Sequence, residues 1–149
     1  MIDQPLDRVM IQHVSKAVRA ELARLRCADQ LKVLSGFPSG CCKVGSLLLA
    51  QCLADAGVPT TAIRYVWGDR RDGDGDLVSH GWLVVGGDVV DITCDQFADA
   101  AVEYLVPEPS AWHASFAPHR AFSYDEVMAF NPEFGEWFAN TYRCIKQFI

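Results

Sequence analysis

A cysteine, a histidine and an aspartate occur in this order along the chain, at Cys42, His80 and Asp91, in surroundings that suit nucleophilic catalysis. A thiol becomes a good nucleophile when its thiolate is stabilised, and the unpaired N–H groups and positive dipole end of a helix N-terminus do this. An imidazole within hydrogen-bond reach takes the thiol proton, and a carboxylate fixes the tautomer of that imidazole. Together the three residues would carry out acyl transfer through a thioester.

The cysteine is expected at the start of a buried helix. Breakers are concentrated in the segment Ser35–Gly40, and an apolar run follows from Val44 to Ala56 and ends at Gly57. The run is apolar on almost all sides, which is typical of a helix in the middle of a domain. A helix therefore begins near Cys42. Gly40 would let a substrate carbonyl approach the backbone N–H of Cys42, which is a ready donor to an oxyanion.

The histidine and the aspartate are expected on two paired strands. His80 begins a run of strand-forming residues, and the two glycines that follow this run are a strong hairpin signal. Counting back from the turn pairs Val85 with Asp88 and places His80 diagonally across from Asp91, within reach of a hydrogen bond. A bulge or a different turn would shift this register by one residue.

For the other candidate residues the sequence gives weaker evidence of a role in catalysis. His13 falls on a predicted helix, and His113 and His119 fall in an irregular segment, so we interpret the last two as loop residues. Trp82 alternates with apolar neighbours and is predicted to pack or to form a cleft wall. Gln96 would either donate an amide hydrogen to the oxyanion or cap a local turn, and we favour the turn.

The remaining sequence predicts an α+β domain. Apolar residues recur at three- and four-residue intervals from Leu6 to Leu25, which indicates an amphipathic helix. The expected strands are 61–67, 78–85, 89–93 and, more weakly, 102–106; the polar loop 68–76 is a hairpin tip, 107–120 is irregular, and helices follow the Ser123/Glu126 capping box and the pair Asn131-Pro132. Residues 1–149 form one domain with helices, then an antiparallel sheet, then helices.

Composition narrows the classes of partner. The 13 Lys and Arg residues form no stripe that could follow phosphates, and the net charge is −6, so we expect no nucleic-acid partner. The negative charge is a mild hint of a basic substrate. No segment has a signal-peptide pattern or the roughly 20 apolar residues that cross a bilayer. We therefore expect a cytoplasmic protein that acts on a peptide or protein; the oligomeric state stays open.

The six cysteines do not predict a metal site. None of them forms a C-x-x-C pair, and no two histidines stand at the spacing of zinc ligands. In a chain without an export signal most thiols are expected to be reduced, and a free cysteine usually packs as a small apolar residue. We expect neither a metal nor an organic cofactor.

Three motifs in this order resemble the core of the transglutaminase-like family, over roughly residues 36 to 97. Residues Gly40 to Pro59 are similar to its Gly-x-Cys, apolar helix and Gly-x-Pro, His80-Gly81-Trp82 to its His-Ala-Trp, and Asp91-Ile92-Thr93 to its Asp-x-Thr. The family places its nucleophile fifteen residues before the glycine that ends the helix, which selects Cys42 over its neighbour Cys41. The sequence also departs from the family pattern: members often carry longer hairpins and a further aromatic residue at the oxyanion site, and here the connection from His80 to Asp91 is short.

The resemblance implies a papain-like α+β fold and a triad of Cys42, His80 and Asp91, with Gln96, Cys41, Gly40 and Trp82 as candidates for oxyanion or substrate contacts. Similar bacterial members include leader-peptide proteases of lasso-peptide pathways and deamidase effectors, so a peptidase, an amidase, a deamidase and a transglutaminase all stay open. One alternative is a non-catalytic binding or immunity-type module with the same fold. Another is an arylamine-type acyltransferase, which the missing Arg-Gly-Gly-x-Cys motif disfavours.

Overall fold

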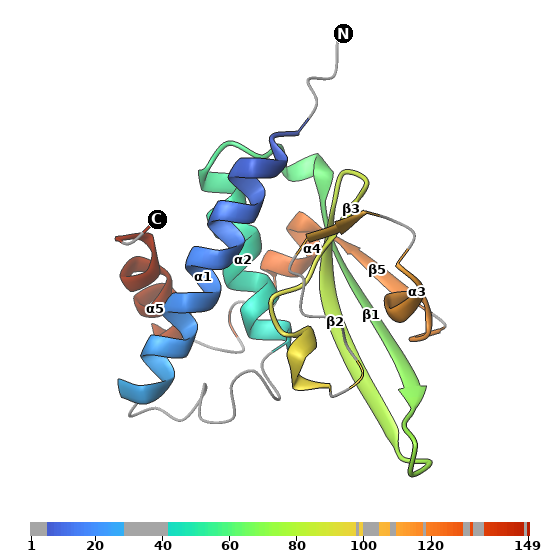
Figure 1. The fold of residues 1–149 in the computed structure, drawn as a ribbon. Coiled ribbons are helices and arrows are strands. Elements are labelled where there is room, and N and C mark those ends of the chain that lie inside the picture. Colours follow the sequence, from blue (N-terminus) through green and yellow to red (C-terminus); the bar gives the residue numbers. More distant parts are fainter. Residues whose placement is uncertain are drawn as a thin grey trace, which may run out of the picture.

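The computed structural model describes residues 6–28, 42–97, 99, 105–107, 110–117, 119–129, 132, 136–147 and 149. Its centre is a five-stranded antiparallel sheet with the strand order β4-β3-β2-β1-β5 (Figure 1). The strands are β1 (Ile63–Arg71), β2 (Leu77–Val85), β3 (Asp88–Val90), β4 (Leu105–Pro107) and β5 (His119–Ser123). The expected α+β class with an antiparallel sheet is therefore confirmed.

Helices lie on both sides of this sheet. They are α1 (Arg8–Ala28), α2 (Cys42–Asp55), α3 (Ala111–Ala114), α4 (Tyr124–Met128) and α5 (Glu136–Lys146), with the short 3-10 helices η1 (Thr60–Ala62) and η2 (Cys94–Gln96). Figure 1 shows α1, α2 and α5 gathered on one side and α3 on the other. None of the helices in the described part of the chain combines the length and apolar character that a membrane span requires.

The predicted buried helix is α2. It begins at Cys42, and ten of its fourteen residues are buried, so it packs on all sides. It ends as predicted: Gly57 has φ 106°, a left-handed conformation that glycine adopts without strain, and the Val58 N–H donates to the Leu53 carbonyl. The large core cluster places α2 between α1 and the sheet. This packing fixes the position of Cys42 against β2.

The β2–β3 hairpin has the predicted register. Val85 faces Asp88 across a turn in which Gly86 has φ 63°. The strand was expected to continue to Thr93, however, and β3 ends at Val90. The chain leaves the sheet there because the Asp91 carboxylate accepts a hydrogen bond from the Thr93 N–H, after which η2 begins. The prediction of a strand over 89–93 is therefore wrong at its C-terminal end.

The β1–β2 hairpin is longer than predicted. β1 extends through Arg71 into the expected loop 68–76, and β2 begins at Leu77, directly after that loop. Only the turn Asp72–Asp76 is left, where Asp72 Oδ1 accepts the N–H groups of Asp74 and Asp76. Gly68 consequently lies in β1, directly opposite His80. A Cβ at Gly68 would stand 2.2 Å from the Phe116 carbonyl oxygen, so glycine lets the segment after α3 approach this part of the sheet.

The C-terminal part differs most from the sequence analysis. The expected irregular segment contains α3 and β5, and β5 pairs with the outer edge of β1. The capping box is confirmed, because Ser123 Oγ accepts from the Glu126 N–H and the Glu126 carboxylate from the Ser123 N–H. Two helices follow it as expected, but Asn131 and residues 102–104 of the weak strand lie outside the described residues.

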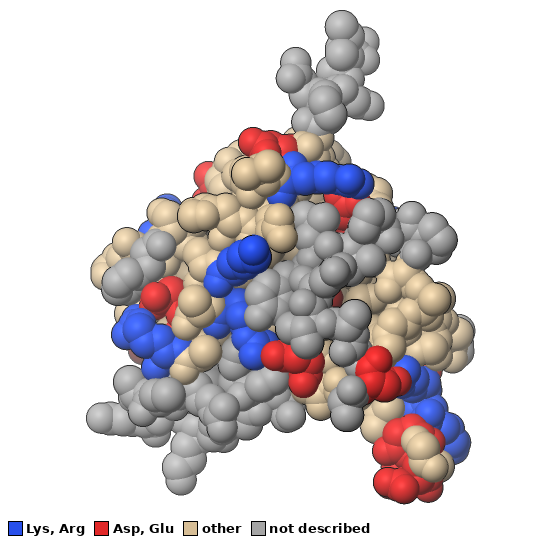
Figure 2. All heavy atoms as spheres, viewed as in Figure 1, with Lys and Arg blue, Asp and Glu red and all other residues tan. Residues whose placement is uncertain are grey.

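Charged side chains do not gather into one large patch on the face seen in Figure 2. Basic and acidic residues alternate over the helices, and the tip of the β1–β2 hairpin carries both signs. Ion pairs account for part of this mixing, such as Arg8 with Asp88 at 2.6 Å and Arg19 with Asp95 at 2.8 Å. The second of these ties α1 to η2, because Asp95 belongs to η2. Arg19 also donates to the Ile92 carbonyl.

Candidate active site

Cys42 lies where the sequence predicted it, at the first position of α2 and only 8% exposed. Its thiol lies beside the His80 imidazole and contributes to the raised pKa of His80. The helix N-terminus adds a positive potential at this position. Gly40 and Cys41 lie outside the described residues, so their predicted roles stay predictions.

His80 lies between Cys42 and Asp91. Its Nε2 is 2.6 Å from Asp91 Oδ2, which is the hydrogen bond expected from the hairpin register. Burial disfavours the imidazolium form, but the bonds to Asp91 and Cys42 outweigh burial and raise the pKa of His80 to about 9. At neutral pH the ring is therefore an imidazolium, and it faces a thiol on one side and a carboxylate on the other.

Gln96 stands at the other nitrogen of the His80 ring. Its Nε2 is 3.2 Å from His80 Nδ1 and donates to the Thr93 carbonyl at 3.1 Å. The bond to Thr93 confirms the predicted local capping, and it also fixes which end of the amide faces His80, because a carbonyl accepts only from the NH2 group. Because this NH2 group cannot donate to a protonated Nδ1, its contact with His80 becomes a hydrogen bond when the imidazole gives up that proton.

Asp91 is buried, with 2% of its surface exposed, and both of its carboxylate oxygens accept hydrogen bonds. Its Oδ1 accepts the Thr93 N–H at 3.0 Å, and its Oδ2 accepts from His80 and from His113 Nε2 at 2.7 Å. Burial alone would raise the pKa of Asp91, but the hydrogen bonds from His113 and His80 reverse that effect and lower it. The carboxylate thus stays ionised in an apolar setting.

His113 was missed by the sequence analysis, and its interpretation as a loop residue is wrong. It lies in α3, is 6% exposed, and its Nδ1 is 2.6 Å from Ser110 Oγ. The only local signal is Ser110, which caps the helix three residues earlier. Nothing in the local sequence shows that α3 packs against Asp91. His119 stays exposed, and its Nε2 donates to the His113 carbonyl at 3.2 Å.

Aromatic rings enclose the His80 imidazole. The ring centroids of Trp82, Trp112 and Phe116 are each 5.6 Å from that of His80, and Phe97 is at 5.1 Å. Trp82 is 2% exposed and packs in this cluster, which confirms its predicted packing role. Such surroundings strengthen electrostatic interactions because little water reaches them.

His80, Asp91 and His113 are also of the types that bind metal ions, and their nearest ligand atoms lie within 4.8 Å of one another. The sequence analysis did not foresee this grouping. Around a tetrahedral zinc with bonds of about 2.0 Å, neighbouring donor atoms stand roughly 3.3 Å apart. The two N···O separations of 2.6 and 2.7 Å are those of direct hydrogen bonds. The present geometry therefore fits a hydrogen-bonded network better than a metal centre.

A pocket of about 210 Å³ opens at Lys43, the residue that follows Cys42 in the sequence. It is lined by Lys43, Tyr65, Trp67, Arg120 and Phe122. The Tyr65 hydroxyl is buried and has no hydrogen-bond partner among the described residues, and its pKa is raised by burial and by the charges of Cys42 and Asp91. The sequence analysis did not identify this hydroxyl.

Gly81 makes room for the Tyr65 hydroxyl. A Cβ at Gly81 would lie 2.0 Å from the Tyr65 hydroxyl oxygen, far inside a normal contact. The backbone after His80 can therefore carry no side chain while Tyr65 keeps this position. This explains in physical terms why glycine stands between His80 and Trp82.

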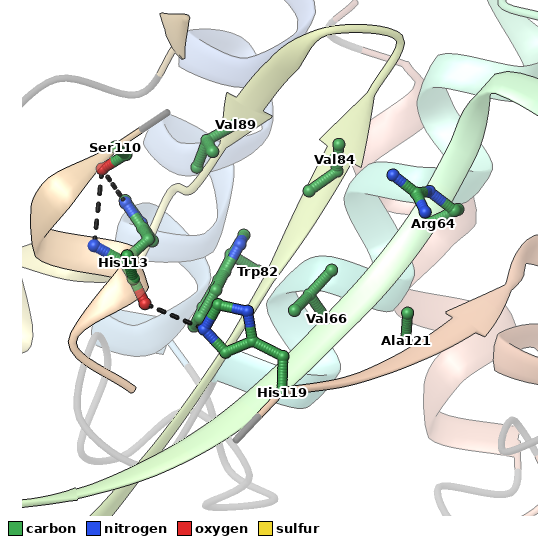
Figure 3. A pocket seen from close by; sticks show the side chains of 10 residues that line it. Arg64, Val66, Trp82, Val84, Val89, Ser110, His113, His119 and Ala121 are labelled. Atoms are coloured by element: carbon green, nitrogen blue, oxygen red, sulfur yellow. Dashed lines mark hydrogen bonds between the residues drawn. The ribbon is translucent and has the colours of Figure 1, made fainter. Parts of the chain in front are cut away.

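A second pocket, of about 250 Å³, lies on the opposite face of the sheet. Val66, Trp82, Val84 and Val89 are among its apolar lining residues, and Figure 3 shows Ser110 and His113 at one end and Arg64 at the other. The dashed lines in Figure 3 mark the bonds of His113 to Ser110 and of its carbonyl to His119. One end of the His113–Asp91–His80 network thus borders this pocket.

The other described cysteines lie in different surroundings from Cys42. Burial raises the pKa values of Cys52 and Cys94 to about 12, and Cys144 is exposed on α5. All four described cysteines are free thiols, while Cys27 has no described side chain. Within the described part of the chain, Cys42 is the cysteine that combines a helix N-terminus with an imidazole.

Comparison of the chain with protein-family models, with curated proteins and with solved structures finds no match. The resemblance to the transglutaminase-like family therefore depends on the three sequence motifs. The geometry adds an independent observation about the residues that these motifs single out: the histidine and the aspartate are hydrogen-bonded at 2.6 Å, and the cysteine lies close enough to the histidine to raise its pKa.

Proposed function

We propose that this protein is a cysteine-dependent acyl-transfer enzyme of the transglutaminase-like type, acting on an amide of a peptide or protein. Cys42 is the nucleophile, His80 the base and acid, and Asp91 the residue that positions His80. The observation that carries the proposal is the placement of one imidazole between a helix-start thiol and a buried carboxylate 2.6 Å away. This series of contacts supports activation of the thiol.

The chemistry follows from the protonation state of His80. The Cys42 thiolate attacks the acyl carbon and forms a carbon–sulfur bond, and the electron pair of the carbonyl moves to oxygen. When the tetrahedral intermediate collapses, the carbon–nitrogen bond breaks and His80 gives its proton to the leaving amine or ammonia. Water or an amine then attacks the thioester while His80 takes the proton of that nucleophile, and the carbon–sulfur bond breaks to release the product and return the Cys42 thiolate beside a protonated His80. Asp91 holds the ring in one tautomer throughout.

Several donors stand near the carbon under attack. The Cys42 backbone N–H belongs to the first turn of α2 and has no carbonyl partner within the helix. The buried Tyr65 hydroxyl lacks a hydrogen-bond partner among the described residues, and its location near Cys42 matches the further aromatic residue that the family often carries. In this proposal these two groups bind the developing oxyanion, with the Gln96 amide beside them.

The pocket beside Cys42 suggests which substrates are accepted. Its lining combines the cations Lys43 and Arg120 with the rings of Tyr65, Trp67 and Phe122, and none of these described lining residues is acidic. This lining favours an acyl group that lies next to an acidic or aromatic side chain. The local charge thus outweighs the weak argument from net charge, which pointed to a basic substrate.

A non-catalytic binding module is the second candidate. It is favoured by burial, because the His80 side chain is fully buried and Cys42 is only 8% exposed. In such a module the hydrogen bonds around Asp91 would serve to hold α3 against the sheet. The two functions differ in whether the Cys42 thiol reacts faster than an ordinary exposed thiol.

Alkylation by iodoacetamide, followed at each cysteine by mass spectrometry, tests the proposal. We expect Cys42 to react faster than exposed Cys144 at neutral pH, and to become slower than Cys144 in His80→Ala. The exposed His13→Ala variant is the matched control and should behave like the wild type. A Cys42 that never exceeds Cys144 would overturn the enzymatic proposal and favour the binding module.

A second step identifies the reaction. Wild-type protein is mixed with amide-containing peptides that differ in the residue beside the scissile or deamidated group, and a thioester on Cys42 is sought by its mass. Release of ammonia indicates deamidation, release of a shorter peptide indicates proteolysis, and incorporation of an added amine indicates transamidation. Turnover of an acyl-coenzyme A instead would indicate the arylamine-type acyltransferase.

A further inference from the structure

Two histidines donate to the same oxygen of Asp91. His80 Nε2 is 2.6 Å and His113 Nε2 is 2.7 Å from Asp91 Oδ2. An ionised carboxylate only accepts hydrogen bonds, so both rings carry a hydrogen on Nε2. A triad needs one such donor, and His113 of α3 is a second one. The extra bond therefore requires an explanation beyond the proposed triad.

The local fold fixes the tautomer and the orientation of His113. Its Nδ1 lies 2.6 Å from the Ser110 hydroxyl, and its backbone carbonyl accepts from His119 (Figure 3). The imidazole packs at 4.7 Å from the Trp82 ring and at 4.8 Å from Trp112. The ring is therefore held at both nitrogens and on its flanks, so its position relative to Asp91 is defined by α3.

Asp91 needs such support because the sheet does not hold it. β3 ends one residue earlier at Val90, and the chain then turns into η2. The Thr93 N–H fixes only Oδ1. His113 donates to Oδ2, the oxygen that His80 also binds, and this hydrogen bond is the largest single effect that lowers the pKa of Asp91 against burial.

We propose that His113 is a positioning residue of the proposed catalytic centre, which holds the Asp91 carboxylate ionised and aimed at His80. The inference rests on the proposed function, because it assigns His113 a task in activating Cys42. It extends the series of contacts to Ser110–His113–Asp91–His80–Cys42 and joins α3, a helix of four residues, to the chemistry. Asp91 then has one donor from β2 and one from α3, and both are required for full reactivity.

The ionisable groups around Asp91 come from several elements. They are His80 on β2, His113 on α3, Cys42 on α2, Tyr65 on β1, and Cys94 on η2. The nearby Asp95 is paired with Arg19 of α1. Both histidines stabilise the ionised carboxylate, and removal of His113 therefore acts mainly on Asp91.

The test compares His113→Phe, which keeps a ring without a donor, with His113→Gln, whose amide can donate in its place. The rate of Cys42 alkylation by iodoacetamide is measured against pH and divided by the rate of Cys144. We expect His113→Phe to lower this ratio about tenfold at neutral pH, because one hydrogen bond to a charged group is lost. In the plot of alkylation rate against pH, the decrease on the acid side should move to higher pH. His113→Gln should recover most of the ratio.

Folding is monitored in the same experiment, because the buried Cys52 and Cys94 become labelled if the protein opens. If His113→Phe fails this control, Ser110→Ala replaces it, because this variant keeps the imidazole but removes the hydroxyl beside Nδ1. We expect Ser110→Ala to lower the ratio of Cys42 to Cys144 alkylation about threefold. An unchanged ratio and acid limb in a folded His113→Phe or Ser110→Ala would overturn the role of His113. If wild-type Cys42 is no faster than Cys144, the proposed function itself fails.

Discussion

The two faces of the sheet are built in different ways. The face toward α1, α2 and α5 carries the large, mostly aliphatic core, to which β2 contributes Leu83 and Val85. The face toward α3 carries a small cluster around Trp82, Val84 and Phe116, together with the buried hydrogen bonds of Asp91. The difference indicates that the first face supplies most of the stability, while the second supplies a rigid polar network.

Cys42 connects these two faces. It belongs to α2, which packs in the aliphatic core, yet its thiol bonds to His80, whose ring lies among the aromatic side chains of the other face. The strand β2 has side chains on both faces, so a shift of α2 relative to β2 would separate the thiol from the imidazole. The following predictions test how independent the two faces are.

The largest expected loss of stability comes from the aliphatic face. Leu48 of α2 is fully buried, and Leu48→Ala should lower the free energy of unfolding by about 2–5 kcal/mol. Val9→Ala, at a site that is 79% exposed, is the matched control and should change it by less than about 0.5 kcal/mol. Urea denaturation measures both variants. A small effect of Leu48→Ala would contradict the assignment of the main core to this face.

Titration tests the polar network on the other face. The folded pKa of His80, about 9, lies above the ordinary value of 6.5, so the imidazolium stabilises the fold fully below pH 6.5, and this contribution is lost as pH rises through 9. We expect it to amount to a few kcal/mol. Urea midpoints measured across this window should fall in the wild type, and the slope should be much reduced in His80→Gln. An equal slope in both proteins would refute the raised pKa.

Local sequence signals predicted the helix and the hairpin that carry Cys42, His80 and Asp91. The breakers before Cys42 and Gly57 after the helix gave the limits of α2, and the glycine turn gave the register that brings His80 to Asp91. These features depend on residues close in sequence, whose backbone preferences act wherever the chain is placed. The catalytic roles of the three residues stay predictions, since no comparison bears on them.

The region around α3 could not be predicted in the same way. β5 is short and mostly exposed, so it lacks the alternating apolar pattern of a half-buried strand. α3 has only four residues, and His113 reaches Asp91 across 22 positions of sequence. Such a contact depends on how α3 packs on Trp82 and on the space that Gly68 leaves for Phe116. Neither is encoded in a local pattern.

Gly81 offers a test at the strand that both faces share. In Gly81→Ala the new methyl group would meet the Tyr65 hydroxyl, and we expect a loss of about 1–3 kcal/mol in the free energy of unfolding. Tyr65→Phe removes the hydroxyl oxygen, which has no partner to lose, and should recover part of this loss in the double variant. Additive losses in the double-mutant cycle would show that the two groups do not meet.

The smallest expected effect distinguishes the two pockets. Arg120 lines the pocket beside Lys43, whereas Arg64 lines the pocket on the opposite face. Reversing the charge in Arg120→Glu should slow alkylation of Cys42 by anionic iodoacetate relative to neutral iodoacetamide by about threefold, since exposed charges interact weakly. Arg64→Glu makes the same charge change and should leave the ratio near the wild-type value. If instead Arg64→Glu lowers the ratio and Arg120→Glu does not, substrates approach Cys42 from the aromatic face, and the acidic preference proposed for the Lys43 pocket is wrong.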